Sequence, residues 1–206
     1  MDDVDRNSKI DRRRYAVVRS FFIKVLVHLV FWDILLNRPG LRWLRRKPLP
    51  RWQKISRNYR QLAIEMGGVL IKLGQFLSVR VDILPPEVTV ELAGLRDEIP
   101  AEPTAAITGQ IEEDFGRPIE TIFAWFSPEP IGAASLGQVH LARLAADNSE
   151  VAVKVLRPGI DVLVETDLAA ITLAVGWLKR YRRISSRVDL DWLIKEFSQV
   201  TRAELD

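Results

Sequence analysis

The sequence predicts an α+β fold, in which a helical first part is followed by a small antiparallel sheet. Apolar residues recur at helical spacing over much of the stretch before residue 127. Beyond that point, two short apolar or alternating stretches flank a polar turn, which indicates a β-hairpin. We therefore expect a disordered arm at residues 1–14, a helical extension at residues 15–126 and a mixed lobe at residues 127–206.

Proline and glycine separate the expected helices of the extension. Residues 38–50 contain three prolines and one glycine, so this segment should connect two helices rather than continue one. Pro85 and Pro86 should end one helix and open the next, and Gly116 should stop another. No strand is expected before Ser127. In chain order, the predicted helices cover residues 21–36, 51–80, 87–96, 104–115 and, as a short piece, 118–123.

The mixed lobe begins with the predicted hairpin. Residues 138–142 alternate, residues 150–156 (EVAVKVL) are rich in β-branched side chains, and residues 145–149 (AADNS) are typical of the turn between them. Helical patterns then cover residues 159–181 and 189–206. Glu165 and Asp167 on the first of these helices are expected to be charges on the helix face.

Composition and charge exclude several classes of protein. The chain has no cysteine, and its two histidines, His28 and His140, lie far apart without a nearby carboxylate cluster, so we predict no metal site among these residues. The net charge of +3 hides an asymmetry: residues 1–60 carry 16 Lys and Arg against 5 Asp and Glu, or +11, which leaves −8 for the rest. A strongly basic first third is typical of a segment that meets an anionic surface.

The apolar stretch at residues 21–36 lies within this basic region. A membrane-spanning helix needs about 20 predominantly apolar residues, whereas this stretch has 16 and contains Lys24, His28 and Asp33. It also ends without the small residues of a signal-peptide cleavage site. Contact with a membrane surface and packing on the chain's own core both remain open, because the two use the same pattern. Nucleic-acid binding is not predicted, since no RNA- or DNA-binding motif accompanies the basic clusters.

The hairpin carries a pattern suited to nucleotide phosphates. Protein kinases place G-x-G-x-x-G-x-V on a strand–turn–strand over ATP, followed by V-A-I-K, whose lysine pairs with the α- and β-phosphates. This chain has G-x-A-x-x-G-x-V at residues 132–139 and V-A-V-K at residues 151–154. Lys154 should share a strand face with Ala152, and the methyl group of Ala134 should change how the loop approaches phosphate. The expected ATP-binding residues are Gly132, Ala133, Ala134, Ser135, Leu136, Gly137, Gln138, Val139, Ala152 and Lys154.

Three motifs together resemble one family. The segments Lys72-Leu73-Gly74-Gln75, residues 133–139 and Glu204-Leu205-Asp206 are similar to the KxGQ motif, the alanine-rich loop and the ExD motif of the UbiB (AarF-related) family of atypical protein-kinase-like proteins. They occur in the family's order, and the resemblance covers about residues 52–206. Residues 1–50 match only loosely.

The resemblance implies a helical KxGQ extension packed on an incomplete protein-kinase-like N-lobe. Lys154 would be catalytic, and Lys72, Gly74, Gln75, Glu204 and Asp206 would form a regulatory cover over the nucleotide pocket. A lysine among apolar helix residues is costly to bury alone, so Lys72 should pair with Glu204 or Asp206. The cofactor would be ATP with Mg²⁺, whose ligands are expected beyond residue 206, as is the catalytic loop. The segment alone is therefore expected to be inactive.

The resemblance further implies an atypical kinase or ATPase that supports the biosynthesis of ubiquinone or another isoprenoid quinone. Its partners would be membrane lipids or isoprenoid quinone intermediates, and quinone-biosynthesis proteins. Its location would be cytoplasmic, peripheral on the inner face of the membrane. The alternative is a non-catalytic module that binds lipids or a partner protein at a membrane surface.

Overall fold

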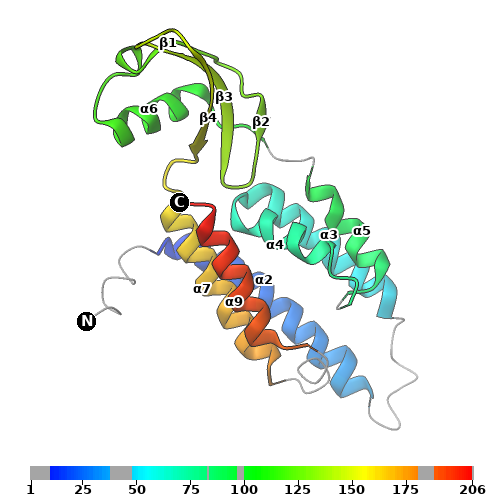
Figure 1. Cartoon of the computed structure of the whole chain (residues 1–206). Helices are drawn as coiled ribbons and strands as arrows, with labels where there is room; N and C mark the ends of the chain where they lie inside the picture. The colour runs from blue at the N-terminus through cyan, green and yellow to red at the C-terminus, as the bar shows by residue number, and fades with distance from the viewer. Residues whose placement is uncertain (1–9, 38–47, 83, 97–99, 181–187, 206) are drawn as a thin grey trace.

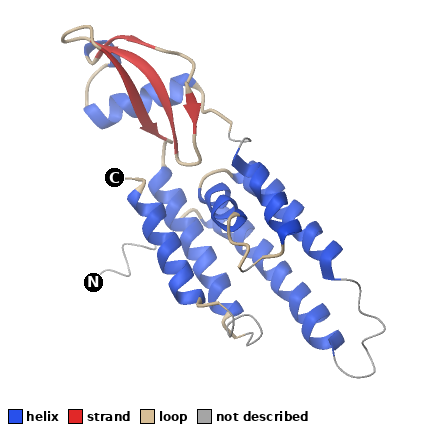
Figure 2. Cartoon of the chain, turned by 45° about the vertical axis from the view of Figure 1, so that its right-hand side comes forward, coloured by secondary structure: helices blue, strands red, loops and turns tan. Residues whose placement is uncertain are grey.

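The structure, a computed structural model, describes residues 10–37, 48–82, 84–96, 100–180 and 188–205. A bundle of helices forms one part and a small sheet backed by one helix forms the other (Figure 1). Coloured by secondary structure, the strands lie together at one end of the molecule (Figure 2). The predicted α+β fold is confirmed.

The first helix begins earlier than predicted. Helix α2 (Arg12–Leu29) continues into a π-helical turn, η2 (Val30–Ile34), and a 3-10 turn, η3 (Leu35–Asn37). Asp11 caps it, because its carboxylate accepts hydrogen bonds from the backbone amides of Arg13 and Arg14 at 2.9 and 3.0 Å. The expected disordered arm at residues 1–14 is therefore wrong for residues 12–14, while residues 1–9 lie outside the described residues.

The predicted long helix at residues 51–80 is two helices, α3 (Pro48–Met66) and α4 (Val69–Ser78). Gly67 and Gly68 separate them with φ angles of +65° and +63°, which L side chains rarely adopt. A Cβ on Gly68 would also lie 2.4 Å from Leu163 Cδ2. The glycine pair thus lets the chain turn where it touches helix α7 (Ile160–Leu178).

The next helices agree with the sequence pattern. Helix α5 (Pro86–Ala93) and the 3-10 turn η5 (Gly94–Arg96) cover the predicted segment 87–96. Helix α6 (Thr104–Phe115) matches its predicted bounds and ends at Gly116, which has a left-handed conformation with φ +65°. Helix α9 (Leu190–Ala203) closes the described chain, with Asp189 as its N-cap.

The sheet contains two short strands that the sequence pattern did not predict. Strand β3 (Gly137–Leu144) pairs antiparallel with β4 (Glu150–Leu156), as the hairpin prediction required. Along its other edge it pairs with β1 (Phe123–Phe126) and β2 (Gly132–Ala133). The short helix expected at 118–123 is only a 3-10 turn, η6 (Ile119–Thr121), because Phe123 belongs to the strand.

Two apolar cores hold these parts together. Helix α6 covers one face of the sheet, where Ile107 and Ile111 pack with Phe123, Ala142 and Val155. The larger core lies among α2, α3, α4, α5, α7 and α9, and Leu136 from the loop between β2 and β3 is part of it. The sheet is therefore anchored to the helical bundle through the same loop that carries the alanine-rich motif.

The N-terminal helix has an unusual surface for a packed element. Residues Arg12–Asp33 form a helix long and apolar enough to cross a membrane, judged by length and composition alone. Only 11% of its apolar 18-residue stretch is buried. One such helix near an N-terminus is weak evidence of a span. It does show that much of the helix's apolar surface has no cover among the described residues.

Candidate functional site

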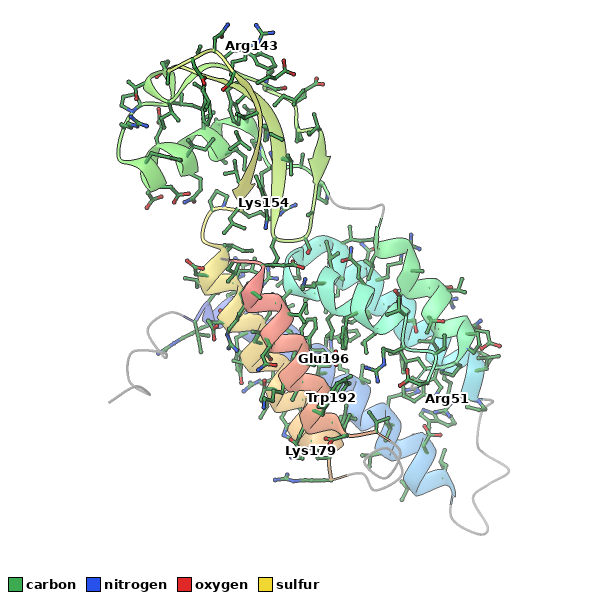
Figure 3. All side chains as sticks on the ribbon, in the orientation of Figure 1. Arg51, Arg143, Lys154, Lys179, Trp192 and Glu196 are labelled. Carbon is green, nitrogen blue, oxygen red and sulfur yellow. The ribbon has the colours of Figure 1, made fainter. Side chains whose placement is uncertain are left out.

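The face of the sheet opposite α6 is open and carries the predicted phosphate lysine. Val139 pairs with Lys154, and Leu141 pairs with Ala152, so these four side chains share one face. Ala152 and Lys154 are exposed, whereas Val155 packs toward α6. The predicted alternation is confirmed. Figure 3 shows Lys154 at the end of the sheet that approaches the helical bundle.

The loop between β2 and β3 forms a tight turn beside this face. The amide of Ala134 donates a 2.7 Å hydrogen bond to the carbonyl of Gly137. Gly137 is required because a Cβ there would lie 2.5 Å from the backbone oxygen of Val155. Ser135 and Leu136 are buried, so they anchor the turn. Gly132 and Ala134 stay exposed at the open side.

Gln138 was predicted to bind ATP, but its side chain lies on the other face. Its Oε1 accepts a 2.8 Å hydrogen bond from the amide of Glu102, and its Nε2 lies 2.7 Å from His140 Nε2. The Nδ1 of His140 donates to the carbonyl of Ser127 at 2.8 Å, so Nε2 is the atom that accepts from Gln138. Any contact of Gln138 with a nucleotide on the open face would have to come from its backbone.

Arg157 holds the same loop through hydrogen bonds, and its role was not predicted from the sequence. Its backbone amide donates to the carbonyl of Leu136 at 3.0 Å. Its guanidinium forms an ion pair with Glu102 and donates to the carbonyls of Pro100 at 2.7 Å and Ala134 at 3.4 Å. The segment that enters α6 is thus tied to the turn. Only the position of Arg157 directly after β4 could have suggested this role.

Glu204 brings the two motif lysines to one place. The ammonium of Lys154 donates to the backbone carbonyl of Glu204 at 3.2 Å. The carboxylate of Glu204 forms an ion pair with Lys72 of α4, whose side chain is 12% exposed, against 46% for that of Glu204. The predicted pairing of Lys72 with Glu204 is confirmed. Asp206 lies outside the described residues.

The other two residues of the KxGQ motif hold α4 in position. A Cβ on Gly74 would lie 2.2 Å from Leu95 Cδ1 and 3.1 Å from Tyr59 Cε1, so glycine allows the helix to approach both. The Nε2 of Gln75 donates to the carbonyl of Leu95 at 3.2 Å. Within the motif, Gly74 and Gln75 therefore hold α4 in place, whereas Lys72 reaches the site.

A small cavity of about 240 Å³ lies beside Lys154 and Glu204, where β4 ends near α6. Ligand pockets typically measure about 300–1,000 Å³, so this cavity is smaller than a usual small-molecule site. A nucleotide would have to use the open strand face as well. No three His, Asp or Glu side chains among the described residues come together in a way that could hold a metal ion.

Asp167 is a buried charge rather than the helix-face charge that we expected. Its side chain is fully buried and accepts two hydrogen bonds from Arg14, from Nε and Nη2, both at 2.7 Å. Burial raises the pKa of Asp167, and the bonds with Arg14 oppose this effect. Sequence periodicity placed Asp167 correctly on α7 but could not show that α2 would supply its partner. Glu165 does lie at the surface, where it pairs with Arg202.

Comparisons with known proteins agree with these motifs. The family described as the ABC1 atypical kinase-like domain matches residues 94–206. A protein named "Probable protein kinase UbiB" from Tolumonas auensis is 42% identical over 169 residues, covering 78% of this chain and 30% of that protein. "Protein ACTIVITY OF BC1 COMPLEX KINASE 8, chloroplastic" from Arabidopsis thaliana is 39% identical over 165 residues, covering 79% of this chain and 21% of that protein.

One solved structure is also similar, that of Rv3197 from Mycobacterium tuberculosis in complex with erythromycin. It is 27% identical, with a TM-score of 0.43, and the match covers 72% of this chain and 37% of that one. The chain spans about a third or less of the length of the curated relatives named above. The matched kinase-like domain covers more than half of the chain and contains the alanine-rich loop, the strand lysine and the ExD glutamate, so this chain belongs to the UbiB family of atypical protein-kinase-like proteins.

Proposed function

We propose that the open face of β3 and β4 binds the phosphates of ATP, with Lys154 as the lysine that contacts them. This proposal rests on the exposure and the hydrogen bonding of the Lys154 ammonium group. It is exposed on the strand face next to the alanine-rich turn, and its hydrogen bond among the described residues goes to a neutral carbonyl, that of Glu204. A carbonyl does not neutralise the charge, so the ammonium can still bind an anion.

Ala152 and the turn complete the proposed contact. A small side chain at Ala152 leaves room for a flat base on the strand face, as in other kinase-like sites. The amide of Ala134 is already bonded to Gly137, so it would not be available to a phosphate in this conformation. We therefore propose that the turn binds phosphate less closely than a glycine-rich loop does. Substituting Ala134 by Gly should change the affinity for ATP or ADP measurably.

The pair formed by Lys72 and Glu204 serves as the cover of this site. It joins α4 to the segment that follows α9, next to the strand lysine. A helix held there would keep bulky acceptors such as protein chains away from the phosphates. When bound, ATP with Mg²⁺ supplies the transferable phosphoryl group. The residues of this chain would bind and orient it, and the metal ligands would come from the segment that the relatives have beyond the matched region.

The wider role follows the relatives. We propose that the longer protein is an atypical kinase or ATPase that supports the biosynthesis of ubiquinone or another isoprenoid quinone, peripheral on the inner face of the membrane. The UbiB relatives support the kinase-like activity. The exposed apolar side chains of α2 and η2, including Val27 and Phe31, support the membrane location. The same surface would also serve the alternative function, that of a non-catalytic module that binds lipids or a partner.

Substitution of Lys154 by Ala tests the proposal. The longer protein that includes the catalytic lobe should lose ATP turnover, and ATP affinity should fall at least about tenfold, since a charge-assisted contact contributes roughly 1.5–3 kcal/mol. The circular dichroism spectrum should not change, because Lys154 is exposed. Lys195→Ala, an exposed lysine on α9, is the matched control and should leave binding and turnover intact. Wild-type affinity and turnover in Lys154→Ala would overturn the proposal.

A further inference from the structure

A second cavity lies far from the strand lysine, in a groove between α2 and α3. It measures about 400 Å³, which is within the roughly 300–1,000 Å³ of small-molecule sites. One wall comes from residues of α2 and η2 that recur at helical spacing, and the other from the first half of α3. Figure 3 shows Arg51 at this junction. The lining residues are Phe21, Lys24, Val25, His28, Trp32, Arg51, Lys54, Ile55 and Asn58.

The groove has an apolar floor and a cationic rim. Arg51 is fixed in the wall, because it forms an ion pair with Asp33 at 3.1 Å and its guanidinium lies 5.3 Å from the ring centroid of Trp32. Lys24 and Lys54 are exposed, and no carboxylate pairs with either of them among the residues that the structure describes. The groove therefore keeps an excess of positive charge beyond the pair of Arg51 and Asp33.

An exposed apolar stripe runs along α2 and continues into η2 and η3, beside the groove. Its members are between 38% and 60% exposed: Ile23 and Val27 on α2, Val30 and Phe31 on η2, and Leu35 on η3. Lys24 stands next to the stripe in the sequence and also lines the groove. A ligand that uses both features must carry an anionic group and an apolar tail. ATP has no apolar tail, whereas a phosphate-bearing membrane lipid carries both parts in one molecule.

We propose that the groove between α2 and α3 binds the phosphate head of an anionic membrane lipid, whose acyl chains lie along the exposed stripe of α2. The site deepens the membrane-surface role proposed above and rests on it. Lys24 and Lys54 contact the phosphate from opposite walls. Phe21, Val25 and Ile55 receive the apolar part of the head and the start of the chains. The helix then lies in the plane of the interface, as an amphipathic surface helix does.

His28 gives this site a direct reporter. Burial and the neighbouring Arg51 lower the pKa of His28, and Asp33 partly opposes them. A bound phosphate adds negative charge beside the ring, which favours the imidazolium and should raise the pKa again. The chain has only two histidines. The second, His140, is fully buried in the sheet lobe and serves as an internal reference.

The test uses the full chain with phosphatidylcholine vesicles that contain or lack phosphatidylglycerol. Binding should require the anionic lipid, and the pKa of His28, followed by NMR, should rise only in its presence while the His140 signal stays constant. The double substitution Lys24→Gln/Lys54→Gln should weaken binding about 25-fold, since a basic residue at an anionic surface contributes ~1 kcal/mol, or about fivefold. Lys195→Gln, on α9, is the matched control and should bind as the wild type does.

Each other outcome overturns a defined part of the proposal. Undiminished vesicle binding by the double variant would exclude the groove. Weaker binding without a lipid-dependent change at His28 would indicate diffuse surface attraction and no discrete site. An equal rise of the His28 pKa with inorganic phosphate alone would show a phosphate site without a lipid. Because Lys24 and Lys54 lie far from Lys154, ATP binding should survive in the double variant. Failure of the lipid proposal would therefore leave the nucleotide proposal standing.

Discussion

The two ion pairs that join distant helices, Arg14 with Asp167 and Lys72 with Glu204, differ in the exposure of their carboxylates. The side chains of Arg14 and Asp167 are 11% and 0% exposed, whereas those of Lys72 and Glu204 are 12% and 46% exposed. A buried carboxylate must keep its partner, because separation would leave an unpaired charge in the interior. At the half-exposed carboxylate of Glu204 water can replace the contact, so separation costs less there than at Asp167. The first pair is therefore a structural tie, and the second is suited to opening.

The buried pair also controls where the exposed pair can form. Besides Asp167, Arg14 donates to the carbonyls of Met66 and Gly67, at 2.6 and 3.1 Å. These carbonyls lie at the break between α3 and α4, and α4 carries Lys72. The N-terminal helix thus fixes the start of the helix that reaches the nucleotide face. A charge near the N-terminus, outside the matched kinase-like domain, therefore positions a motif residue of the site.

Replacing Arg14 by Leu should have the largest effect. Asp167 would lose its partner, and the two carbonyls at the helix break would lose their donor. Breaking a buried pair from one side costs about 3–5 kcal/mol of folding free energy. Urea denaturation of the variant and the wild type measures this difference. Arg57→Leu is the matched control, since Arg57 pairs with Glu91 while 57% exposed, and should cost less than about 1 kcal/mol.

The pH dependence of that loss identifies its cause. The pKa of Asp167 is raised in the folded protein, and removal of Arg14 should raise it further. A group whose pKa is higher in the folded state disfavours folding when it is ionised, so the penalty is absent below the unfolded value of 3.8 and grows as the pH rises. The stability gap between variant and wild type should therefore shrink in acid. A gap that is independent of pH would contradict the buried-carboxylate explanation.

Replacing Gly74 by Ala should have an intermediate effect. The new methyl group would overlap Leu95 and press on Tyr59, both of which are buried. Such overpacking typically costs about 1–3 kcal/mol. Gly109→Ala on α6 is the matched control, because nothing lies within 4 Å of its Cβ position. That variant should gain up to about 1 kcal/mol, since alanine favours a helix over glycine. Equal stability of the two variants would show that Gly74 is not needed for close packing.

Sequence patterns located the helices and the hairpin but not the contacts between distant segments. Periodicity and proline placed α5 and α6, and alternation put Ala152 and Lys154 on one face of β4. The break at Gly67 was missed because apolar spacing continued through it. Strand β1 was missed because its four residues are held by α6 and β3 rather than by their own pattern. The partners of Asp167 and Gln138 come from segments 153 and 36 residues away, which no local pattern specifies.

Replacing Glu204 by Gln should have the smallest effect on stability. The Glu204 side chain is 46% exposed, and a glutamine oxygen can still accept a hydrogen bond from Lys72, whose side chain is only 12% exposed. Loss of the charge alone should therefore cost about 1 kcal/mol of folding free energy. Lys154 bonds to the backbone carbonyl of residue 204, which the substitution keeps, so the strand lysine should remain in place. The variant therefore removes the ion pair that covers the site and keeps the hydrogen bond that positions Lys154.

If the pair holds α4 over the site, backbone amides of α4 and of the end of α9 should exchange hydrogen faster in Glu204→Gln, and Lys72→Met should give the same pattern. ATP affinity should change by the same factor in both variants, because each removes one side of the same contact. Unchanged exchange in both variants would mean that packing by Gly74 and Gln75 alone holds the helix, and that the ion pair does not act as a latch.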